Sequence, residues 1–320
     1  MDTKFQSKNA AFISSDLNVK VAWLYHVEGM TQEAIASLLD VGRSTVVRSL
    51  AASSADHLVI TTVNAKSAYQ VELERKLEER WGLESAIVVP APHDPKHLER
   101  SIGHAVATYV NQHVNDGMTV AVGGGATLHS SLDFMHRRML QDTVVVSLVG
   151  SLPFSKWINP SIVASKMAER LGVESYQISA PVVLEDADLR DRLWAQPMLA
   201  EVRRRARKAD LAILTVGEVA PTATIFKHGI VPMKLIEPLQ KLGAVANILC
   251  CFVNAEGDLV DHPINRCIMS LLPEEVASVG RIILAAGGTH KVAGIRAALR
   301  AVKARILITD SETAEKLLEM

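Results

Sequence analysis

Two glycine-rich turns contain the residues whose types and spacing are best suited to chemistry. The first, Gly123-Gly124-Gly125-Ala126-Thr127, follows an aliphatic run and precedes a helical pattern. Glycines allow backbone N–H groups to converge on an anion, and the start of a helix adds a favourable potential. Thr127 can cap that helix and donate its hydroxyl. Because the segment matches neither the dinucleotide-binding pattern nor the P-loop, a tight turn without a ligand stays open as an alternative.

The second turn, Gly287-Gly288-Thr289-His290-Lys291, also joins an aliphatic run to a helical pattern. Lys291 lies at the start of the predicted helix, where a cation is unfavourable for the helix dipole unless an anion lies beside it. Ligands of open α/β sheets bind beyond the carboxyl ends of the strands, so we expect both turns to border one crevice. The pattern favours a sugar phosphate as the ligand.

A different chemistry is indicated between Met30 and Leu50. The apolar spacing predicts two short helices separated by a turn, the second beginning at Gly42. Short polar and basic side chains on such a second helix reach the base edges and phosphates of DNA, while the first helix crosses the backbone. The predicted DNA contacts are Thr31, Gln32, Arg43, Ser44, Thr45 and Arg48. A helical hairpin that serves only packing is the alternative.

Three features of this segment count against DNA binding. Asp40 stands where such motifs usually have a left-handed glycine, although Asp tolerates that conformation better than most residues. Ser49 stands where an apolar residue is common, and residues 1–60 carry more acidic than basic side chains. Because phosphate contacts dominate affinity for DNA, one copy should bind weakly, and we expect an oligomer. Residues 58–63 could form a wing strand after the second helix.

The elements that must position these residues change in character near residue 60. Beyond it, aliphatic runs alternate with helical patterns, which predicts right-handed βαβ units and a mostly parallel sheet covered by helices on both faces. Strands are expected at residues 86–89, 118–122, 143–149, 174–178, 211–216, 244–253, 281–286 and 305–309, and helices at 95–114, 127–140, 160–171 and 290–302. The fold class is therefore α/β. An all-helical helix-turn-helix domain, winged if the extra strand forms, covers residues 1–60, and a Rossmann-like effector domain covers residues 61–320.

The composition is that of a globular protein, with 320 residues, 48% of them hydrophobic and 22% charged. A net charge of −1 neither requires nor excludes DNA, because a DNA-binding face can be local. We interpret Cys250, Cys251 and Cys267 as buried thiols in a reducing compartment rather than metal ligands. The first 16 residues lack a long apolar run, so we expect no signal peptide, no membrane span and a cytoplasmic location.

Several spaced blocks together resemble the SorC family of transcriptional regulators, which is sometimes grouped with DeoR-type proteins. The blocks are residues 25–50, 123–128 and 209–212, with stronger matches at 285–291, 295–300, 306–310 and 313–314. The resemblance implies a sugar-binding domain related in fold to phosphosugar isomerases. It also implies assembly as a homotetramer and binding to double-stranded operator DNA that a sugar or its phosphate controls. By position, Gly124, Ala126, Thr127 and Lys291 match the family's phosphate-contacting motifs.

The chain departs from the family pattern at Asn247. The family usually has Gly-Asp after a Gly-Ala-Val stretch, whereas this chain reads Gly243-Ala244-Val245-Ala246-Asn247. A carboxylate that would accept hydrogen bonds from sugar hydroxyls is replaced by an amide, which both accepts and donates. The change favours an unphosphorylated sugar or polyol. Glu218 follows the strand predicted at 211–216 and is a further candidate contact to the effector.

These observations predict a regulator of a sugar or polyol operon, without catalysis, metal or cofactor, in which effector and operator binding are coupled. One alternative is a phosphosugar isomerase-type enzyme, but an isomerase has no use for a helix-turn-helix. A dinucleotide-binding oxidoreductase would need a different glycine pattern. A regulator with a non-functional effector site stays open because of Asn247. The basic run at residues 203–208 is interpreted as a solvated helix face, with a subunit or DNA contact as the alternative.

Overall fold

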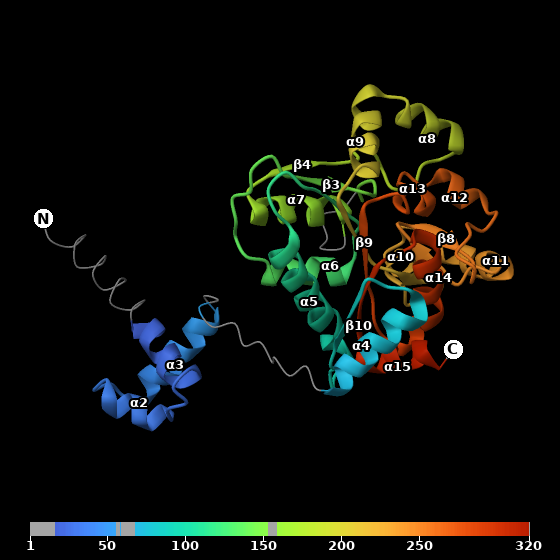
Figure 1. Cartoon of the computed structure of the whole chain (residues 1–320). Helices are drawn as coiled ribbons and strands as arrows, with labels where there is room; N and C mark the ends of the chain where they lie inside the picture. Colours follow the sequence, from blue (N-terminus) through green and yellow to red (C-terminus); the bar gives the residue numbers. More distant parts are fainter. Residues whose placement is uncertain (1–16, 56–57, 59–67, 153–158, 320) are drawn as a thin grey trace, which may run out of the picture. The chain divides into compact units, whose positions relative to one another are not determined.

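The computed structural model describes residues 17–55, 58, 68–152 and 159–319. The chain divides into two compact units, Met1–Ala65 and Lys66–Met320, each with its own core. Figure 1 shows the elements of both units. In the described part of the chain, no helix combines the length and the apolar character that crossing a membrane requires.

The described part of the first unit is helical. Residues 17–26 form a helix, followed by α2 (Gln32–Leu38) and α3 (Arg43–Ala55). Asp40 adopts a left-handed φ of 51° in the turn between α2 and α3, the conformation that the position requires. Val21, Ile35 and Val46 bury completely against one another, one from each helix. The wing strand predicted at residues 58–63 lies outside the described residues, apart from Leu58.

The second unit is built on a seven-stranded parallel sheet, which confirms the predicted α/β class. Its strands are β1 (Ser85–Val89), β2 (Thr119–Val122), β3 (Val144–Ser147), β4 (Glu174–Tyr176), β5 (Leu211–Leu214), β9 (Arg281–Ala285) and β10 (Ile306–Asp310). The spatial order is β1-β10-β9-β5-β2-β3-β4. After β2 the chain adds β3 and β4 toward one edge of the sheet. After β5 it adds β9 and β10 toward the other edge, so the direction of winding reverses between β2 and β5.

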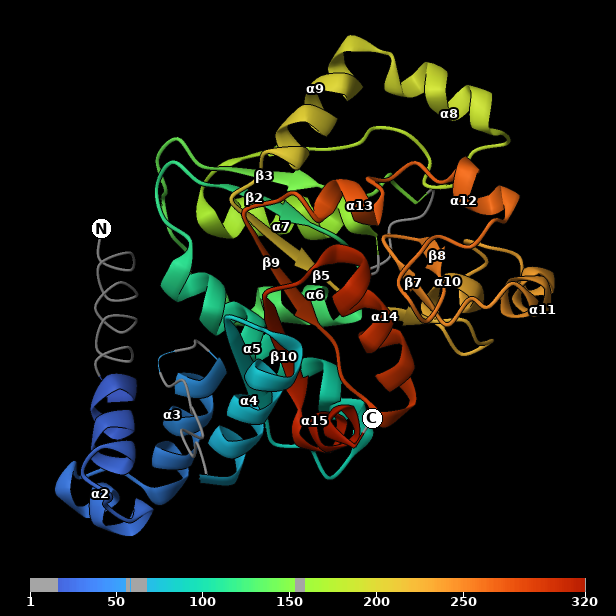
Figure 2. The same ribbon diagram turned by 45° about the vertical axis from the view of Figure 1, so that its right-hand side comes forward.

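Helices cover both faces of this sheet, as Figures 1 and 2 show. One face packs against α5 (Leu98–His113), α6 (Ala126–Ser131) and α7 (Pro160–Leu171), and the other against α4 (Ala68–Trp81), α9 (Pro197–Arg207), α14 (Val292–Val302) and α15 (Ser311–Leu318). Along β2, Val120 and Val122 join the first core and Ala121 joins the second. Burial on both faces explains why the strands read as continuous aliphatic runs.

The prediction of one strand over residues 244–253 is wrong. This segment forms a hairpin of β7 (Ala246–Ile248) and β8 (Cys251–Val253), which joins β6 (Gly217–Glu218) in a separate antiparallel sheet. Leu249 and Cys250 make the turn with φ values of 51° and 66°, a conformation that hairpins usually assign to Asn or Gly. Leu249 is buried and Cys250 is half-buried, and neither is a polar or glycine residue that would mark the turn in the sequence.

The helix predicted at residues 127–140 is also too long. Helix α6 ends at Ser131 and a 3-10 turn, η2 (Leu132–Phe134), follows it. After this turn the backbone amides of Arg138 and Leu140 donate to the carbonyls of Arg170 and Leu171 at the end of α7. The last carbonyls of a helix accept no hydrogen bond from their own helix. Here they accept from residues 138 and 140 and hold this segment in an extended path.

The remaining elements are short. They are η1 (Pro95–His97), α8 (Ala187–Trp194), α10 (Thr224–Lys227), η3 (Met233–Leu235), α11 (Ile236–Lys241), α12 (Pro263–Cys267), α13 (Pro273–Val276) and η4 (Thr289–Lys291). The basic run lies on α9, where its arginines pair with carboxylates of the same unit: Arg203 with Glu275 at 2.8 Å, and Arg204 and Arg205 with Glu201 at 2.6 and 2.8 Å. The arginines of the basic run therefore lie on a face of α9 where carboxylates of the same domain pair with them.

Candidate functional site

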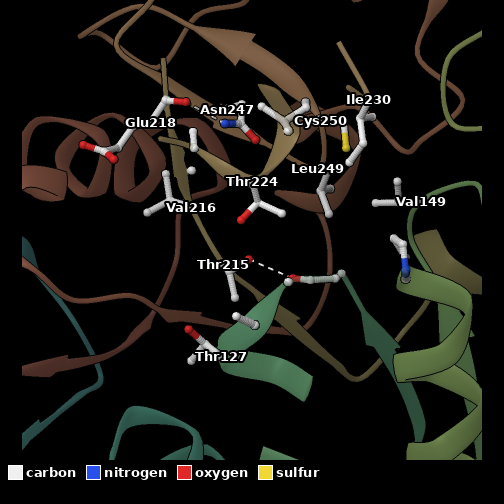
Figure 3. Close-up of a pocket in the computed structure, with 18 of the residues that line it drawn as sticks. Thr127, Val149, Thr215, Val216, Glu218, Thr224, Ile230, Asn247, Leu249 and Cys250 are labelled. Atoms are coloured by element: carbon white, nitrogen blue, oxygen red, sulfur yellow. Dashed lines mark hydrogen bonds between the residues drawn. The ribbon is translucent and has the colours of Figure 1, made fainter. Parts of the chain in front are cut away.

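A cavity of about 520 Å³ lies beyond the carboxyl ends of β2 and β5. The winding of the sheet reverses between these two strands, and such a reversal is where open α/β sheets bind ligands. Figure 3 shows side chains reaching the cavity from several elements, with Thr127 and Thr215 on its lower side and Asn247 and Cys250 on its upper side. The cavity is therefore the candidate effector site.

The first glycine turn forms one wall of this cavity. Its predicted contacts Gly123, Gly124, Gly125, Ala126 and Thr127 all line the space. Thr127 does not cap the helix, because α6 begins at Ala126 and Gly125 occupies the cap with a φ of 107°. Within the described residues, the amides of Ala126, Thr127 and Leu128 have no acceptor, as expected for the first amides of a helix. Ala126 and Thr127 line the cavity, so their amides are available to a ligand oxygen, whereas Leu128 lies outside the lining.

Close packing fixes the shape of this turn. The Thr215 hydroxyl donates to the carbonyl of Gly124 at 2.9 Å, and the bond is visible in Figure 3. A Cβ on Gly124 would lie 2.8 Å from Cγ of Pro160, the first residue of α7. Glycine at this position therefore allows α7 to approach the turn, and Thr215 joins the end of β5 to the end of β2.

The second glycine turn contributes only part of what the sequence predicts. His290 and Lys291 line the cavity, whereas Gly288 lies outside its lining. The Gly288 amide donates to Oδ2 of Asp310 at 2.9 Å and to Oγ1 of Thr313 at 2.7 Å. It is therefore engaged within the protein. Among the described residues, Lys291 has no ion-pair partner, so its charge is available to a ligand.

Glu218 and Asn247 lie on neighbouring strands of the small sheet and both line the cavity. Nδ2 of Asn247 donates to the carbonyl of Glu218 at 3.0 Å. Only the amide nitrogen can donate there, so the contact leaves Oδ1 as the acceptor that a ligand could use. A Cβ on Gly217 would lie 2.4 Å from Asn247 Nδ2, so glycine makes room for this arrangement. Oε2 of Glu218 lies 3.8 Å from Nε2 of His290.

Sequence reasoning missed a further group of lining residues. They include the hydroxyl side chains Thr215, Thr222 and Thr224, the apolar side chains Leu152, Val182, Ile230 and Leu249, and Glu99 and Cys250. Thr215 directly follows β5 at the reversal of winding, and this position was the signal that could have identified it. Glu99 and Thr224 lie at the starts of α5 and α10, and the others lie in connecting segments and in the unpredicted hairpin turn. Hydrophobic periodicity does not show that a side chain at such a position faces a cavity.

The lining suits binding of a small polyhydroxylated molecule better than covalent chemistry. In the part of the chain that the structure describes, it combines hydroxyls, an amide, one lysine and two carboxylates with an apolar wall. Burial and the neighbouring Cys251 raise the pKa of the Cys250 thiol to about 12, so it stays protonated near neutral pH and is a poor nucleophile. Over the described ranges, no group of three or more His, Cys, Asp or Glu side chains is arranged to hold a metal ion.

The predicted DNA contacts lie on α2 and α3 of the first unit. Thr31 caps α2, with its hydroxyl oxygen accepting from the Ala34 amide at 3.2 Å, and Gln32 is the first residue of α2. Arg43, Ser44, Thr45 and Arg48 lie in the first two turns of α3, and all but the half-buried Thr45 are exposed. Arg43, Ser44 and Arg48 are therefore accessible on α3, while Val46 and the polar Ser49 and Ser53 are buried.

Comparisons with known proteins bear on both units. Residues 66–319 match the Sugar-bind family, a sugar-binding domain. The chain is 31% identical over 304 residues to the erythritol catabolism regulatory protein EryD of Brucella abortus (strain 2308), covering 94% of this chain and 96% of that protein. It is 24% identical over 307 residues to the sorbitol operon regulator of Klebsiella pneumoniae, covering 95% and 98%.

The fold agrees with these relationships. The crystal structure of the full-length sorbitol operon regulator SorC from Klebsiella pneumoniae superimposes with a TM-score of 0.73 at 23% identity, covering 95% of this chain and 98% of that one. The family match spans most of the chain, and a regulator at 31% identity aligns along almost its whole length. The chain therefore belongs to the SorC family of sugar-responsive transcriptional regulators.

Proposed function

We propose that this protein regulates a sugar or polyol operon, and that a small polyol, sugar or sugar phosphate bound in the cavity sets its affinity for operator DNA. One observation carries the proposal: free backbone amides at the first turn, Lys291 at the second turn and Asn247 on the small sheet all border a single cavity. These groups offer donors, a positive charge and an acceptor to one small molecule.

The balance of groups supports a ligand that carries at most one phosphate. The amides of Ala126 and Thr127 and the ammonium of Lys291 would hold an anionic end. Glu218 and Asn247 would accept hydrogen bonds from hydroxyls at the other end. Of the described residues, two carboxylates and one lysine line the cavity, and the carboxylates would repel a second phosphate. The erythritol and sorbitol regulators among the relatives support a polyol or its monophosphate.

Asn247 supports a working effector site rather than a non-functional one. Its bond to the Glu218 carbonyl at 3.0 Å orients the amide, and an aspartate could not donate this bond. The remaining oxygen serves a ligand hydroxyl as a carboxylate oxygen would. The departure from the family pattern therefore keeps an acceptor in the cavity.

The first unit is proposed to bind DNA as a helix-turn-helix, with α3 as the recognition helix. Arg43, Ser44, Thr45 and Arg48 would contact the major groove and its phosphates, and Thr31 and Gln32 would contact the backbone beside α2. With few positive charges per copy, useful affinity requires several copies, so we propose a homo-oligomer, a tetramer by analogy with the family. Effector binding would change the arrangement of the copies and thereby the spacing of their recognition helices.

The test is fluorescence anisotropy of the full-length protein with DNA from upstream of its own gene and the neighbouring operon, at fixed salt. Erythritol, sorbitol, other polyols and sugars, and their monophosphates are titrated into the complex. Specific binding that one compound shifts supports the proposal and names the effector. Specific binding that no compound shifts contradicts the effector assignment. No specific binding contradicts the regulator and turns attention to isomerase activity.

A further inference from the structure

We propose that Asp310 and Thr313 are positioning residues, which hold the second glycine turn in the shape that presents His290 and Lys291 to the cavity. Asp310 ends β10 and caps α15, and Thr313 lies in the first turn of α15. Neither residue lines the cavity. The inference rests on the proposed function only in treating the cavity as the effector site.

The two side chains and the turn form a closed network of hydrogen bonds. The Gly288 amide donates to Asp310 Oδ2 at 2.9 Å and to Thr313 Oγ1 at 2.7 Å. The Thr313 hydroxyl in turn donates to Asp310 Oδ2 at 2.5 Å. Asp310 is 2% exposed and Thr313 is fully buried, so water does not compete for these bonds. Such bonds to a buried carboxylate are stronger than neutral ones.

The shape of the turn depends on this network. Gly288 has a φ of 100°, and a Cβ there would lie 2.6 Å from Cε1 of His290. A Cβ on Gly287 would lie 2.3 Å from Asp310 Oδ2. The turn is therefore folded directly onto the carboxylate, and His290 is folded back over the glycine. Without the carboxylate, the Gly288 amide would keep only the Thr313 hydroxyl as an acceptor.

Helix capping alone does not account for Asp310. Its Oδ1 accepts from the Thr313 amide at 3.0 Å, which is the ordinary capping bond. Asp186 caps α8 in the same way, accepting from the Leu189 amide at 2.7 Å, in an exposed setting. A cap thus requires one carboxylate oxygen and no burial. The burial of Asp310 and the use of its second oxygen are explained by the turn.

The first test needs no ligand and measures hydrogen–deuterium exchange in the full chain. D310N keeps an oxygen for the Thr313 amide but faces the Gly288 amide with an NH₂ group. We expect exchange at Gly288 to rise at least about tenfold, as the loss of a charge-assisted bond implies. The matched control is D186N, which changes the other cap and should leave Gly288 unchanged. Unchanged exchange in D310N would overturn the proposal.

A second pair of variants guards against misfolding of D310N. T313V removes the hydroxyl but keeps the shape of the side chain, and T313S keeps the hydroxyl. We expect faster exchange at Gly288 in T313V and near wild-type exchange in T313S, while peptides from α7 stay unchanged in both. If T313S and T313V behave alike, packing rather than the hydroxyl holds the turn and the proposal fails.

The link to the cavity is tested with erythritol 4-phosphate as the probe in isothermal titration calorimetry. We expect D310N and T313V to weaken probe binding about tenfold, the effect of losing one or two hydrogen bonds, with T313S and D186N within about twofold of wild type. Full affinity in a variant whose Gly288 exchange has risen would refute the role of the turn at the cavity. Absence of binding to the wild-type protein would contradict the proposed effector class, while the exchange data alone would decide the positioning of the turn.

Discussion

The two glycine turns of the second unit look alike in sequence but are used differently. Each joins a buried parallel strand to a helical element through consecutive glycines. At the first turn, the amides that begin α6 have no protein acceptor among the described residues and border the cavity. At the second turn, the Gly288 amide is bonded to Asp310 and Thr313, and only the side chains that follow reach the cavity. A shared local pattern therefore predicts the backbone path, while residues distant in sequence decide which groups are left for a ligand.

The largest expected difference between the turns concerns stability. In G287A the new Cβ meets Asp310 Oδ2 at 2.3 Å and Cδ1 of Ile102 at 2.5 Å, and the hydrogen-bonded carboxylate cannot move aside. We expect the free energy of unfolding to fall by about 3 kcal/mol. In G123A the nearest atom is Cδ2 of Leu249 at 3.3 Å, so a loss of about 1 kcal/mol or less is expected. Urea unfolding measures both, and equal losses would contradict the difference between the turns.

The next effect concerns charge at the second turn. K291Q removes the one lysine that lines the cavity among the described residues, so binding of erythritol 4-phosphate should weaken by about 10- to 100-fold, as expected for a hydrogen bond to a charged group. Binding of unphosphorylated erythritol should change by less than about threefold. K227Q, on an exposed residue of α10 outside the lining, is the control in calorimetry. An equal loss of affinity for both ligands in K291Q would show that Lys291 does not bind the phosphate group.

A smaller effect is expected for the hydroxyl at the first turn. T127V keeps the shape of the side chain but removes a donor that borders the cavity. We expect affinity for erythritol 4-phosphate to fall about three- to tenfold, the usual value of one neutral hydrogen bond. The exposed Thr108, which bonds only to the carbonyl of His104 on α5, provides the control T108V. If T127V matches T108V, the first turn contributes through its backbone alone.

The smallest effect is a pH dependence of stability near the first turn. Burial, with a contribution from Lys166, lowers the pKa of His129 on α6. The unfolded chain therefore takes up a proton at higher pH than the folded chain does. The stabilisation is complete above about pH 6.5, the ordinary histidine value, and declines as the pH falls toward the lowered pKa. Urea unfolding between pH 7 and pH 5 should show a flatter profile for H129Q than for wild type.

His104 provides a comparison on the neighbouring helix α5. Burial, followed by Arg100, lowers its pKa as well, so H104Q should also flatten part of the profile. An H129Q profile that coincides with that of the wild type would show that the helix opened by the first turn does not respond to protonation.

The sheet was predictable because its physics is local and repetitive. Strands buried on both faces must be aliphatic, and helices between them must carry an apolar stripe, so the runs ending at Val122 and Ala285 could be read directly. The hairpin over residues 246–253 could not be predicted, because Leu249 and Cys250 adopt the left-handed conformation of its turn in place of glycine or asparagine. Tertiary packing replaced the usual turn chemistry at this point.

The candidate site was predictable to the extent that it follows from the sheet. Residues directly after β2 and β9 had to lie near the reversal of winding, and Gly124, Thr127 and Lys291 do line the cavity. The role of the Gly288 amide could not be foreseen, because its partners Asp310 and Thr313 lie more than 20 residues away. The lining threonines of the segment after β6 carry no periodic signal. The DNA contacts on α2 and α3 stay predictions.

The pairing of β1 with β10 has a consequence for how the protein is made. β1 is an edge strand whose only partner in the sheet is β10, with Ser85 opposite Ile306. Ribosomes add about 5–20 residues per second, so β1 waits at least about 10 seconds for the strand that completes it. During that time β1 and the apolar side of α4, including Leu73 and Leu77, are exposed on the nascent chain. We therefore expect the first unit, whose contacts are local, to fold during translation, and the second unit to need chaperone protection until the last strand emerges.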